Sequence, residues 1–452
     1  MTKVIFDIAI FANSSDLSGV PRFVFEVLSR LSGSGGVEVV LICSLANEAR
    51  AFSNLKSNFD FDLPFQSRGQ AEFVFSAEYF RGKFADEKRR PTFLGRVEDV
   101  FLSIFPKSVI LRKVLDIVRR VKWMISPPDE QTVLDWQFPL RSPFFEKLVM
   151  ESDVYFSPFH PLISELSVKP SIRKMIVIHD LISVTHPELV RGKTGYSMLQ
   201  KIRDQVTDDL FVFTDSENSR RDIERVFPPI SPDKLSVIPL GASDNFCFCS
   251  DRARIEGVLR KYGIPSNCRY IVSVGSQEDR KNFAGVIGAF GKFLGCYGGE
   301  FSDLYLVIAG ASSCYSTAAM CRAFGELDGR SKRRLLRVGY VLEEDLPFIY
   351  NGAECFCFMS FYEGFGLPVL EAMQSGTPVI TSNTSSLPEV VGGAGIMLDP
   401  NDVEGLSDAF YRVLTDDNLR EAMRQKGLEQ AKKFNWSRCV ELILDKINQP
   451  TS

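Results

Sequence analysis

The sequence has little that would indicate a metalloprotein, a disulfide-stabilised protein or a membrane-spanning one. Its ten cysteines are scattered without C-x-x-C spacing, which argues against a zinc site or a disulfide framework and favours a reducing, cytoplasmic setting. No uninterrupted apolar run reaches the roughly 18–20 residues that a membrane-spanning helix needs. The formal charge is only −4, which argues against general nucleic-acid binding.

The sequence has only three histidines, and all of them fall within one stretch. His160, His179 and His186 are separated by 19 and then 7 residues, a spacing that fits no single-helix ligand pattern, and no cysteine lies nearby. We therefore predict no metal site. Residues 1–7 indicate the start of a strand and do not resemble a signal peptide.

With 452 residues, 45% of them hydrophobic, the chain is long enough for two or three ordinary cores. Short apolar runs alternate with amphipathic helical patterns in two successive halves. This alternation predicts an α/β fold with two doubly wound, Rossmann-like domains that face a cleft. We place an N-terminal domain at 1–240, with a variable and basic region at 45–150, a C-terminal domain at 241–433, and a last helix at 434–452 that returns to the N-terminal domain.

The most informative stretch covers residues 355–373, which are expected to form a strand, a glycine-rich turn and a helix. Gly364 and Gly366 flank Phe365, so the backbone can adopt positive φ and approach a ligand closely. Leu367 and Pro368 fall where the first helical turn begins, and the free N–H groups of that turn can bind phosphate or sugar oxygens.

Two carboxylates frame this turn, Glu363 before the glycines and Glu371 eight residues later. A glycosidase pair is one interpretation, but such pairs normally come from separate elements that face each other across the substrate. A better interpretation assigns one acid to the sugar hydroxyls and the other to the ribose of one ligand. For Glu371 alone, a structural role near a helix N-terminus stays open.

Further polar residues follow other predicted strands, where ligands of doubly wound folds bind. Arg280 and Lys281 come shortly after the strand at 270–275, and adjacent cations at a strand–helix turn suit a diphosphate. His179 ends the strand at 175–178, and Asp180 either orients its ring or caps the turn. Arg22 opens the helix after the first strand, as either a ligand or a solvated residue.

Several motifs together resemble the donor site of glycosyltransferase family 4, retaining enzymes with the GT-B fold. They are E-G-F-G-L-P-V-L-E-A-M at 363–373, G-T-P-V-I at 376–380 and L-P-E-V-V-G-G-A-G at 387–395. With H-D-L at 179–181 and R-K-N at 280–282, the closest resemblance is to bacterial mannosyltransferases that use GDP-mannose for surface polysaccharide. GDP-fucose, UDP-hexose and dTDP-rhamnose stay open as donors.

The resemblance implies a nucleotide-sugar donor, a glycan or lipid-linked acceptor, and no cofactor. Glu363 would hold the sugar hydroxyls, Glu371 the ribose, and His179 the sugar from across the cleft. Ser276 stands where family members often carry a second arginine. The predicted catalytic residues are Glu363, His179, Lys281 and Arg280; the donor-binding residues are Gly19, Ser276, Gly364, Phe365, Gly366, Leu367 and Glu371; and the acceptor-side candidates are Arg22, His160 and Asp180.

The resemblance also implies a mechanism. No convincing enzyme nucleophile is present, which suits a front-face reaction in which the leaving phosphate accepts the acceptor's proton. No D-x-D motif stands at the end of a predicted strand, so the reaction is expected to be metal-independent. A catalytically silent nucleotide-sugar binder or assembly scaffold, and an epimerase or phosphorylase on the same fold, are the alternative hypotheses.

The segment 81–122 is strongly basic, with twelve Lys/Arg against five Asp/Glu. Residues 109–125 combine helical periodicity with a basic face and Trp123. Such a helix either packs on the core with a solvated basic back or lies on an anionic membrane surface. The second interpretation predicts peripheral attachment to the inner face of the membrane.

Overall fold

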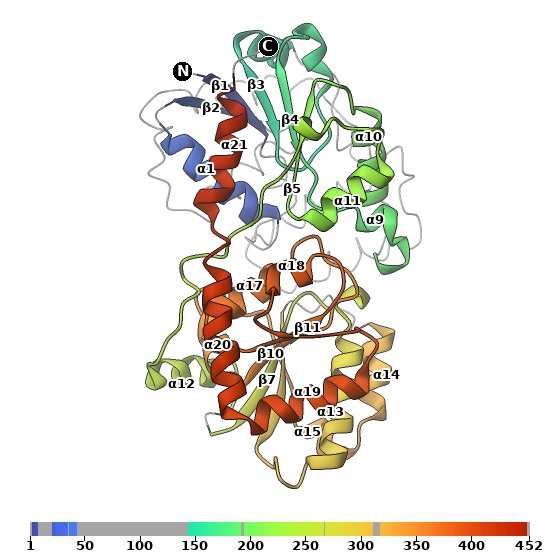
Figure 1. The fold of residues 1–452 in the computed structure, drawn as a ribbon, viewed down its shortest axis with the longest axis vertical. Coiled ribbons are helices and arrows are strands. Elements are labelled where there is room, and N and C mark those ends of the chain that lie inside the picture. The colour runs from blue at the N-terminus through green and yellow to red at the C-terminus, as the bar shows by residue number, and fades with distance from the viewer. Residues whose placement is uncertain are drawn as a thin grey trace, which may run out of the picture.

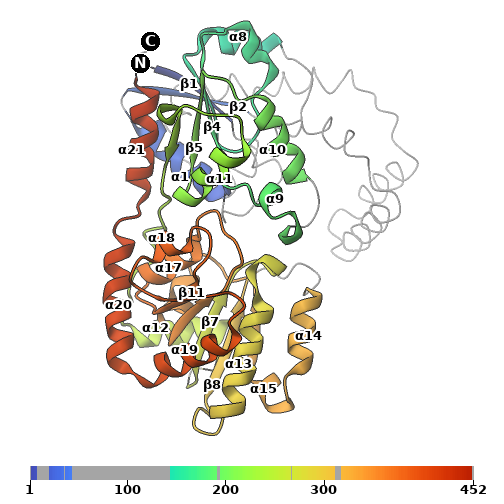
Figure 2. The same cartoon turned by 45° about the vertical axis from the view of Figure 1, so that its right-hand side comes forward.

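The computed structural model describes residues 2–7, 20–34, 36–42, 143–190, 194–265, 267–310 and 317–449. The basic segment 81–122, the helix expected at 109–125, and Gly19 lie outside the described residues. The predictions made for them therefore stay predictions. Figures 1 and 2 show the described elements gathered around two separate sheets.

The first sheet consists of six parallel strands in the order β2-β1-β3-β4-β5-β6. Strands β3 and β5 are buried throughout, as expected for a parallel sheet covered on both faces. The strands are β1 (Thr2–Asp7), β2 (Val37–Ile42), β3 (Val154–Ser157), β4 (Arg173–Val177), β5 (Leu210–Thr214) and β6 (Leu235–Val237). We call the part of the chain that carries them the N-terminal half.

The second sheet also has six parallel strands, in the order β12-β11-β10-β7-β8-β9. They are β7 (Arg269–Val274), β8 (Leu304–Ala309), β9 (Leu335–Gly339), β10 (Cys355–Phe358), β11 (Val379–Ser382) and β12 (Ile396–Leu398). We call this part the C-terminal half. The two parallel sheets confirm the predicted α/β fold with two doubly wound units.

Helices cover both sheets. In the N-terminal half they are α1 (Val20–Gly33), α8 (Pro143–Glu151), α9 (Ile182–Thr185), α10 (Thr194–Asp204) and α11 (Glu217–Val226), with short 3-10 helices η3 (Ser164–Val168), η4 (Pro187–Leu189) and η5 (Pro232–Lys234). In the C-terminal half they are α12 (Arg252–Lys261), η6 (Asp279–Lys281), α13 (Phe283–Tyr297), α14 (Ala318–Glu326), α15 (Gly329–Arg333), α16 (Leu346–Asn351), α17 (Leu367–Gln374), α18 (Leu387–Val391), α19 (Val403–Thr415) and α20 (Asp417–Ala431).

The last helix, α21 (Trp436–Ile447), leaves the C-terminal half and lies along the N-terminal half beside α1 (Figure 1). Trp436 is buried against Phe23 of α1, with ring centroids 6.2 Å apart. The connection after β6 passes close to the start of α21. A Cβ on Gly241 would lie 2.5 Å from the backbone nitrogen of Trp436. The domain boundaries at 240/241 and 433/434 remain a proposal, which this crossing of two connections supports.

No helix in the described ranges is both long enough and apolar enough to cross a membrane.

Candidate active site

A glycine turn joins β10 to α17 at the edge of the C-terminal half. Gly366 has a φ of 106°, in the left-handed region, and Pro368 follows in the first turn of α17. The preceding backbone is fixed by serines from the segment before α18. The Ser385 hydroxyl accepts a hydrogen bond from the Glu363 N–H at 2.9 Å, and the Ser386 hydroxyl lies 2.8 Å from the Phe365 carbonyl oxygen.

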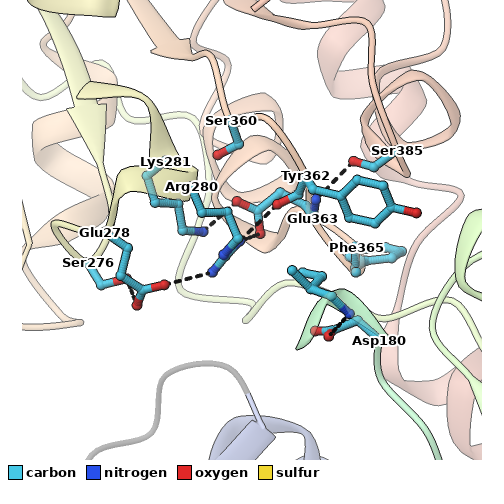
Figure 3. A network of polar contacts seen from close by, with 12 residues as sticks. Asp180, Ser276, Glu278, Arg280, Lys281, Ser360, Tyr362, Glu363, Phe365 and Ser385 are labelled. Atoms are coloured by element: carbon cyan, nitrogen blue, oxygen red, sulfur yellow. Dashed lines mark hydrogen bonds and ion pairs between the residues drawn. The ribbon is translucent and has the colours of Figure 1, made fainter. Parts of the chain in front are cut away.

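Beside this turn, Glu363 is held between two cations (Figure 3). Lys281 Nζ lies 2.7 Å from Glu363 Oε1, and Arg280 Nη1 lies 2.6 Å from Oε2. The three side chains are nearly buried, with 8–14% of each exposed. Burial alone would raise the pKa of Glu363, but the charges of Lys281 and Arg280 outweigh it and lower that pKa to about 2. Glu363 is therefore ionised at neutral pH, and the cluster carries one net positive charge.

The two cations belong to η6, which follows the end of β7. The Arg280 carbonyl accepts the Phe361 N–H at 2.9 Å, and its guanidinium donates to the Tyr362 carbonyl oxygen at 3.0 Å. Lys281 Nζ lies 4.9 Å from the centre of the Phe358 ring, at the end of β10. Sequence reasoning placed these cations at a diphosphate, and the structure adds that they already neutralise Glu363.

Ser276 lies beside this cluster rather than within it. Its hydroxyl donates to Glu278 Oε1 at 2.8 Å, and the other Glu278 oxygen lies 3.4 Å from Arg280 Nη2 (Figure 3). Ser276, which stands where family members often carry an arginine, thus holds the Glu278 carboxylate next to Arg280.

Glu371 is the fifth residue of α17, beyond its first turn, so the interpretation as a first-turn acid does not describe it. The Tyr350 hydroxyl donates to Glu371 Oε2 at 3.3 Å. Burial raises the pKa of Glu371 to about 7, against the opposing charge of Arg22. The carboxyl is thus poised to bind hydroxyl groups, and its ionisation depends on the charges around it.

His179 lies at the end of β4 with both ring nitrogens engaged. Nδ1 is 2.8 Å from Asp215 Oδ2, and Nε2 is 2.9 Å from the Pro158 carbonyl oxygen. Because the Pro158 carbonyl oxygen only accepts hydrogen bonds, Nε2 carries a proton, and Nδ1 shares a second proton with Asp215, whose own pKa burial raises. Burial opposes the charged ring, but Asp215 outweighs it and raises the pKa of His179 above its ordinary value.

Asp215 therefore orients the histidine, and Asp180 does not. An Asp180 oxygen accepts the Ile182 N–H at 3.0 Å and caps the turn before α9, which was the other interpretation considered. Sequence reasoning missed Asp215 as a site residue. Its position, directly after the strand next to that of His179, is the signal that could have found it.

The other predicted acceptor-side residues, His160 and Arg22, have different partners. The His160 ring packs edge-on against Phe159, and burial lowers the pKa of His160. Arg22 pairs with Glu26 and with Glu343 of the C-terminal half. No group of three metal-binding side chains occurs in the part of the chain that the structure describes.

A second set of contacts between the halves was not foreseen. Glu389 of α18 accepts the N–H groups of Glu217 and Asn218, at 3.0 and 3.1 Å, at the start of α11. Tyr362 receives a hydrogen bond from the Asn218 amide at 2.7 Å, and its hydroxyl donates to Asp222. The start of α11 therefore meets Tyr362 and the motif at 387–395 at the contact between the two halves.

Comparison with known proteins agrees with this geometry. The family described as "Glycosyl transferases group 1" matches residues 255–430. The chain is 34% identical over 268 residues to O-antigen chain mannosyltransferase B of Escherichia coli. The aligned residues are 59% of this chain and 68% of that protein. The chain is 27% identical over 276 residues to the serotype-specific mannosyltransferase WbdA of Escherichia coli. The aligned residues are 60% of this chain but only 33% of that protein's length.

Solved structures share the fold at low sequence identity. A glycosyltransferase from Rickettsia africae matches with a TM-score of 0.61 at 14% identity, over 99% of this chain and 97% of that one. WaaG, a glycosyltransferase of lipopolysaccharide biosynthesis, matches with a TM-score of 0.60 at 14% identity, over 99% and 100%. The protein is thus a glycosyltransferase of the GT-B fold. It belongs to the group 1 glycosyl transferases, glycosyltransferase family 4.

Proposed function

We propose that the protein transfers a hexose, with mannose favoured, from a nucleotide sugar to a glycan or lipid-linked acceptor in polysaccharide or lipopolysaccharide synthesis, with retention of configuration. The observation that carries this proposal is the buried cluster of Lys281, Arg280 and Glu363 beside the glycine turn. The similarity to mannosyltransferases of O-antigen synthesis supports mannose. The donor that we propose is GDP-mannose.

Lys281 and Arg280 would bind the donor diphosphate together with the backbone N–H groups of Gly364 to Leu367, since Pro368 has no N–H and the Val369 N–H donates to the Gly366 carbonyl oxygen. Their charge would stabilise the negative charge that develops on the departing phosphate, the kind of electrostatic effect that usually dominates such steps. The diphosphate would compete for these cations with Glu363 and with Glu278, which lies 3.4 Å from Arg280.

Glu363 would accept hydrogen bonds from the sugar hydroxyls. With a pKa of about 2 it has no proton to give at neutral pH, and each oxygen is held by a cation. It suits neither a general acid nor a free nucleophile. This fits a front-face reaction in which the leaving phosphate accepts the acceptor's proton.

His179 would approach the sugar from the N-terminal half. Its ring can donate to a sugar hydroxyl only if Nε2–H leaves the Pro158 carbonyl oxygen, while Asp215 keeps Nδ1 engaged. Glu371 would bind the ribose hydroxyls as a carboxylate.

The first test is thermal unfolding of the protein with GDP, UDP, dTDP and ADP. A nucleotide at about 100 times its dissociation constant adds roughly 2.7 kcal/mol to the stability. We expect one nucleotide, GDP, to stabilise the wild type and Lys292→Ala, but not Lys281→Ala. Lys292 is a suitable control because its amine lies on the outer side of α13, paired with Glu404.

Turnover distinguishes the enzyme from a silent binder. The matching nucleotide sugar should give slow hydrolysis, and transfer when an acceptor is present, with the anomeric configuration of the product read by NMR. Binding without any turnover would favour the scaffold hypothesis. An altered nucleotide sugar would indicate an epimerase.

The membrane-surface hypothesis for residues 81–122 stays a separate proposal. It predicts salt-sensitive binding to anionic vesicles that is lost in the double variant Arg119→Glu, Arg120→Glu. Equal binding by wild type and variant would contradict it.

A further inference from the structure

An ion pair connects the beginning of α1 in the N-terminal half with the C-terminal half. Arg22 is the third residue of α1, and Glu343 belongs to the loop between β9 and α16. Both terminal nitrogens of the guanidinium point to one oxygen of Glu343, while Nε lies 3.3 Å from Glu26 Oε1. The Arg22 side chain is only 11% exposed, so its charge is enclosed between the halves.

This pair acts electrostatically on the residue proposed to bind the ribose. The charges that act on the part-buried Glu371 are those of Arg22, from α1, and Glu343, from the β9–α16 loop. Arg22 favours ionised Glu371 and Glu343 opposes it. Arg22 belongs to the helix after β1 and Glu343 follows β9, so both come after strands of parallel sheets, on the side where ligands of doubly wound folds bind.

The Arg22 guanidinium uses only one of the two carboxylate oxygens of Glu343. A guanidinium binds best when its two parallel N–H groups meet two oxygens, as in a bidentate carboxylate or phosphate contact. Here both terminal nitrogens share a single carboxylate oxygen. A phosphate group would offer each nitrogen its own oxygen and would carry more charge than Glu343.

We propose that Glu343 occupies Arg22 in the absence of donor, and that the diphosphate of the nucleotide sugar displaces it, so that Arg22 becomes a phosphate ligand contributed by the N-terminal half. Glu343 is the exchangeable partner because its side chain is 34% exposed, whereas that of Arg22 is only 11% exposed. This inference rests on the proposed function, and it assigns to Arg22 and Glu343 a role in donor binding.

If Glu343 and the diphosphate compete for Arg22, the direction in which each substitution changes diphosphate affinity can be predicted. Removing the charge of Glu343 frees Arg22 and should tighten diphosphate binding, whereas removing a true ligand weakens it. Glu344, the next residue, is a matched control because it is exposed and carries the same charge in the same loop.

The experiment is calorimetric titration of the full chain with GDP, UDP, ADP and dTDP. The variants are Glu343→Gln, Glu344→Gln, Arg22→Gln, and the double variant Arg22→Gln, Glu343→Gln, with Arg22→Lys included in case Arg22→Gln unfolds. We expect Glu343→Gln to bind the preferred nucleotide about fivefold more tightly or better, a usual size for coupling between sites. Glu344→Gln should stay within about twofold, and both Arg22 variants should bind less tightly.

The double variant isolates the exchange. If Glu343 acts by occupying Arg22, then Glu343→Gln should bring no gain once Arg22 is gone. A gain that persists without Arg22, or weaker binding by Glu343→Gln alone, would overturn the inference.

The two proposals fail differently. If Lys281→Ala abolishes nucleotide binding while the Arg22 and Glu343 variants bind like wild type, the donor site stands and the exchange is wrong. If neither wild type nor Glu343→Gln binds any of the four nucleotides, both are wrong.

Discussion

The backbone of Gly364 in the C-terminal half lies directly against Asp180 in the N-terminal half. A Cβ built on Gly364 would come within 2.9 Å of the Asp180 Cβ and 3.0 Å of the His179 carbonyl oxygen. The Ser219 hydroxyl lies between the same segments, 3.1 Å from the His179 oxygen and 3.3 Å from the Gly364 oxygen. The glycine turn beside Glu363 therefore also provides the surface on which the halves meet.

Replacing Gly364 with alanine should keep the halves from closing fully, because the backbone atoms it would meet cannot move aside cheaply. We expect glycosyl transfer to fall by roughly 100-fold, as expected for misplacement of reacting groups by about 1 Å. Nucleotide binding to the C-terminal half alone should fall much less. Gly393→Ala is the control, since a Cβ there meets nothing within 4 Å; equal activities in the two variants would show that this contact is unimportant.

Glu363→Gln should destabilise the fold as well as stop the reaction. It leaves Lys281 and Arg280 buried without their carboxylate, which costs about 3 kcal/mol or more when one partner of a buried pair is removed. Because the folded pKa of Glu363 lies at about 2, below the ordinary 4.5, its contribution is present above pH 4.5 and is lost as the pH falls toward 2.

Urea unfolding of wild type and Glu363→Gln measures this contribution. The difference in unfolding free energy should be full at pH 6–7 and shrink below about pH 4.5. A difference that stays constant down to pH 3 would show that the carboxylate charge is not responsible.

Glu371 should give the opposite dependence on pH. Its folded pKa of about 7 exceeds the ordinary 4.5, so the unfolded chain loses the proton first and wild-type stability should fall as the pH rises between these values. The free energy of unfolding should fall by about 3 kcal/mol in total over this pH range, and this fall should be absent in Glu371→Gln. The groups that set this pKa are Arg22, Glu343 and Tyr350.

Nucleotide binding should show the reverse trend at the same residue. Ribose hydroxyls donate to a carboxylate, so wild-type affinity should rise as the pH passes through about 7, while Glu371→Gln binds weakly and without this rise. Titrations at pH 6 and 8 measure it. A wild type whose affinity is flat across that range would contradict the assignment of Glu371.

Glu389→Ala should loosen the contact between the halves. The Glu389 carboxylate accepts two free N–H groups at the start of α11, so its loss should cost about 1 kcal/mol, the usual effect of removing a helix cap. We expect a lower unfolding temperature and slower transfer. Glu404→Ala, which removes an exposed acid paired with Lys292, should change neither; matching losses would indicate a general charge effect.

Much of the fold could be predicted from local patterns, because a buried parallel strand and an amphipathic helix each leave a short-range periodicity. The last helix and the strand before the glycine turn are examples; the structure places them at 436–447 and 355–358. The glycine turn was equally visible, since Gly366 adopts positive φ at the N-cap of a helix that begins with Leu367 and Pro368. The motifs also indicated the family, which the comparisons confirm.

The sequence by itself determined which residue types stand at the ends of the strands, but only the tertiary structure decided their partners. Glu363 lies 82 residues from Lys281, and Arg22 lies 321 residues from Glu343, so no spacing rule connects them. Asp215 rather than Asp180 orients His179 because β5 pairs with β4 and brings their carboxyl ends together. The fold also sets the pKa values of the two glutamates apart. Burial would raise the pKa of Glu363, but two neighbouring cations lower it to about 2. Burial and the neighbouring Glu343 raise the pKa of Glu371 to about 7, although Arg22 and the Tyr350 hydroxyl act against them.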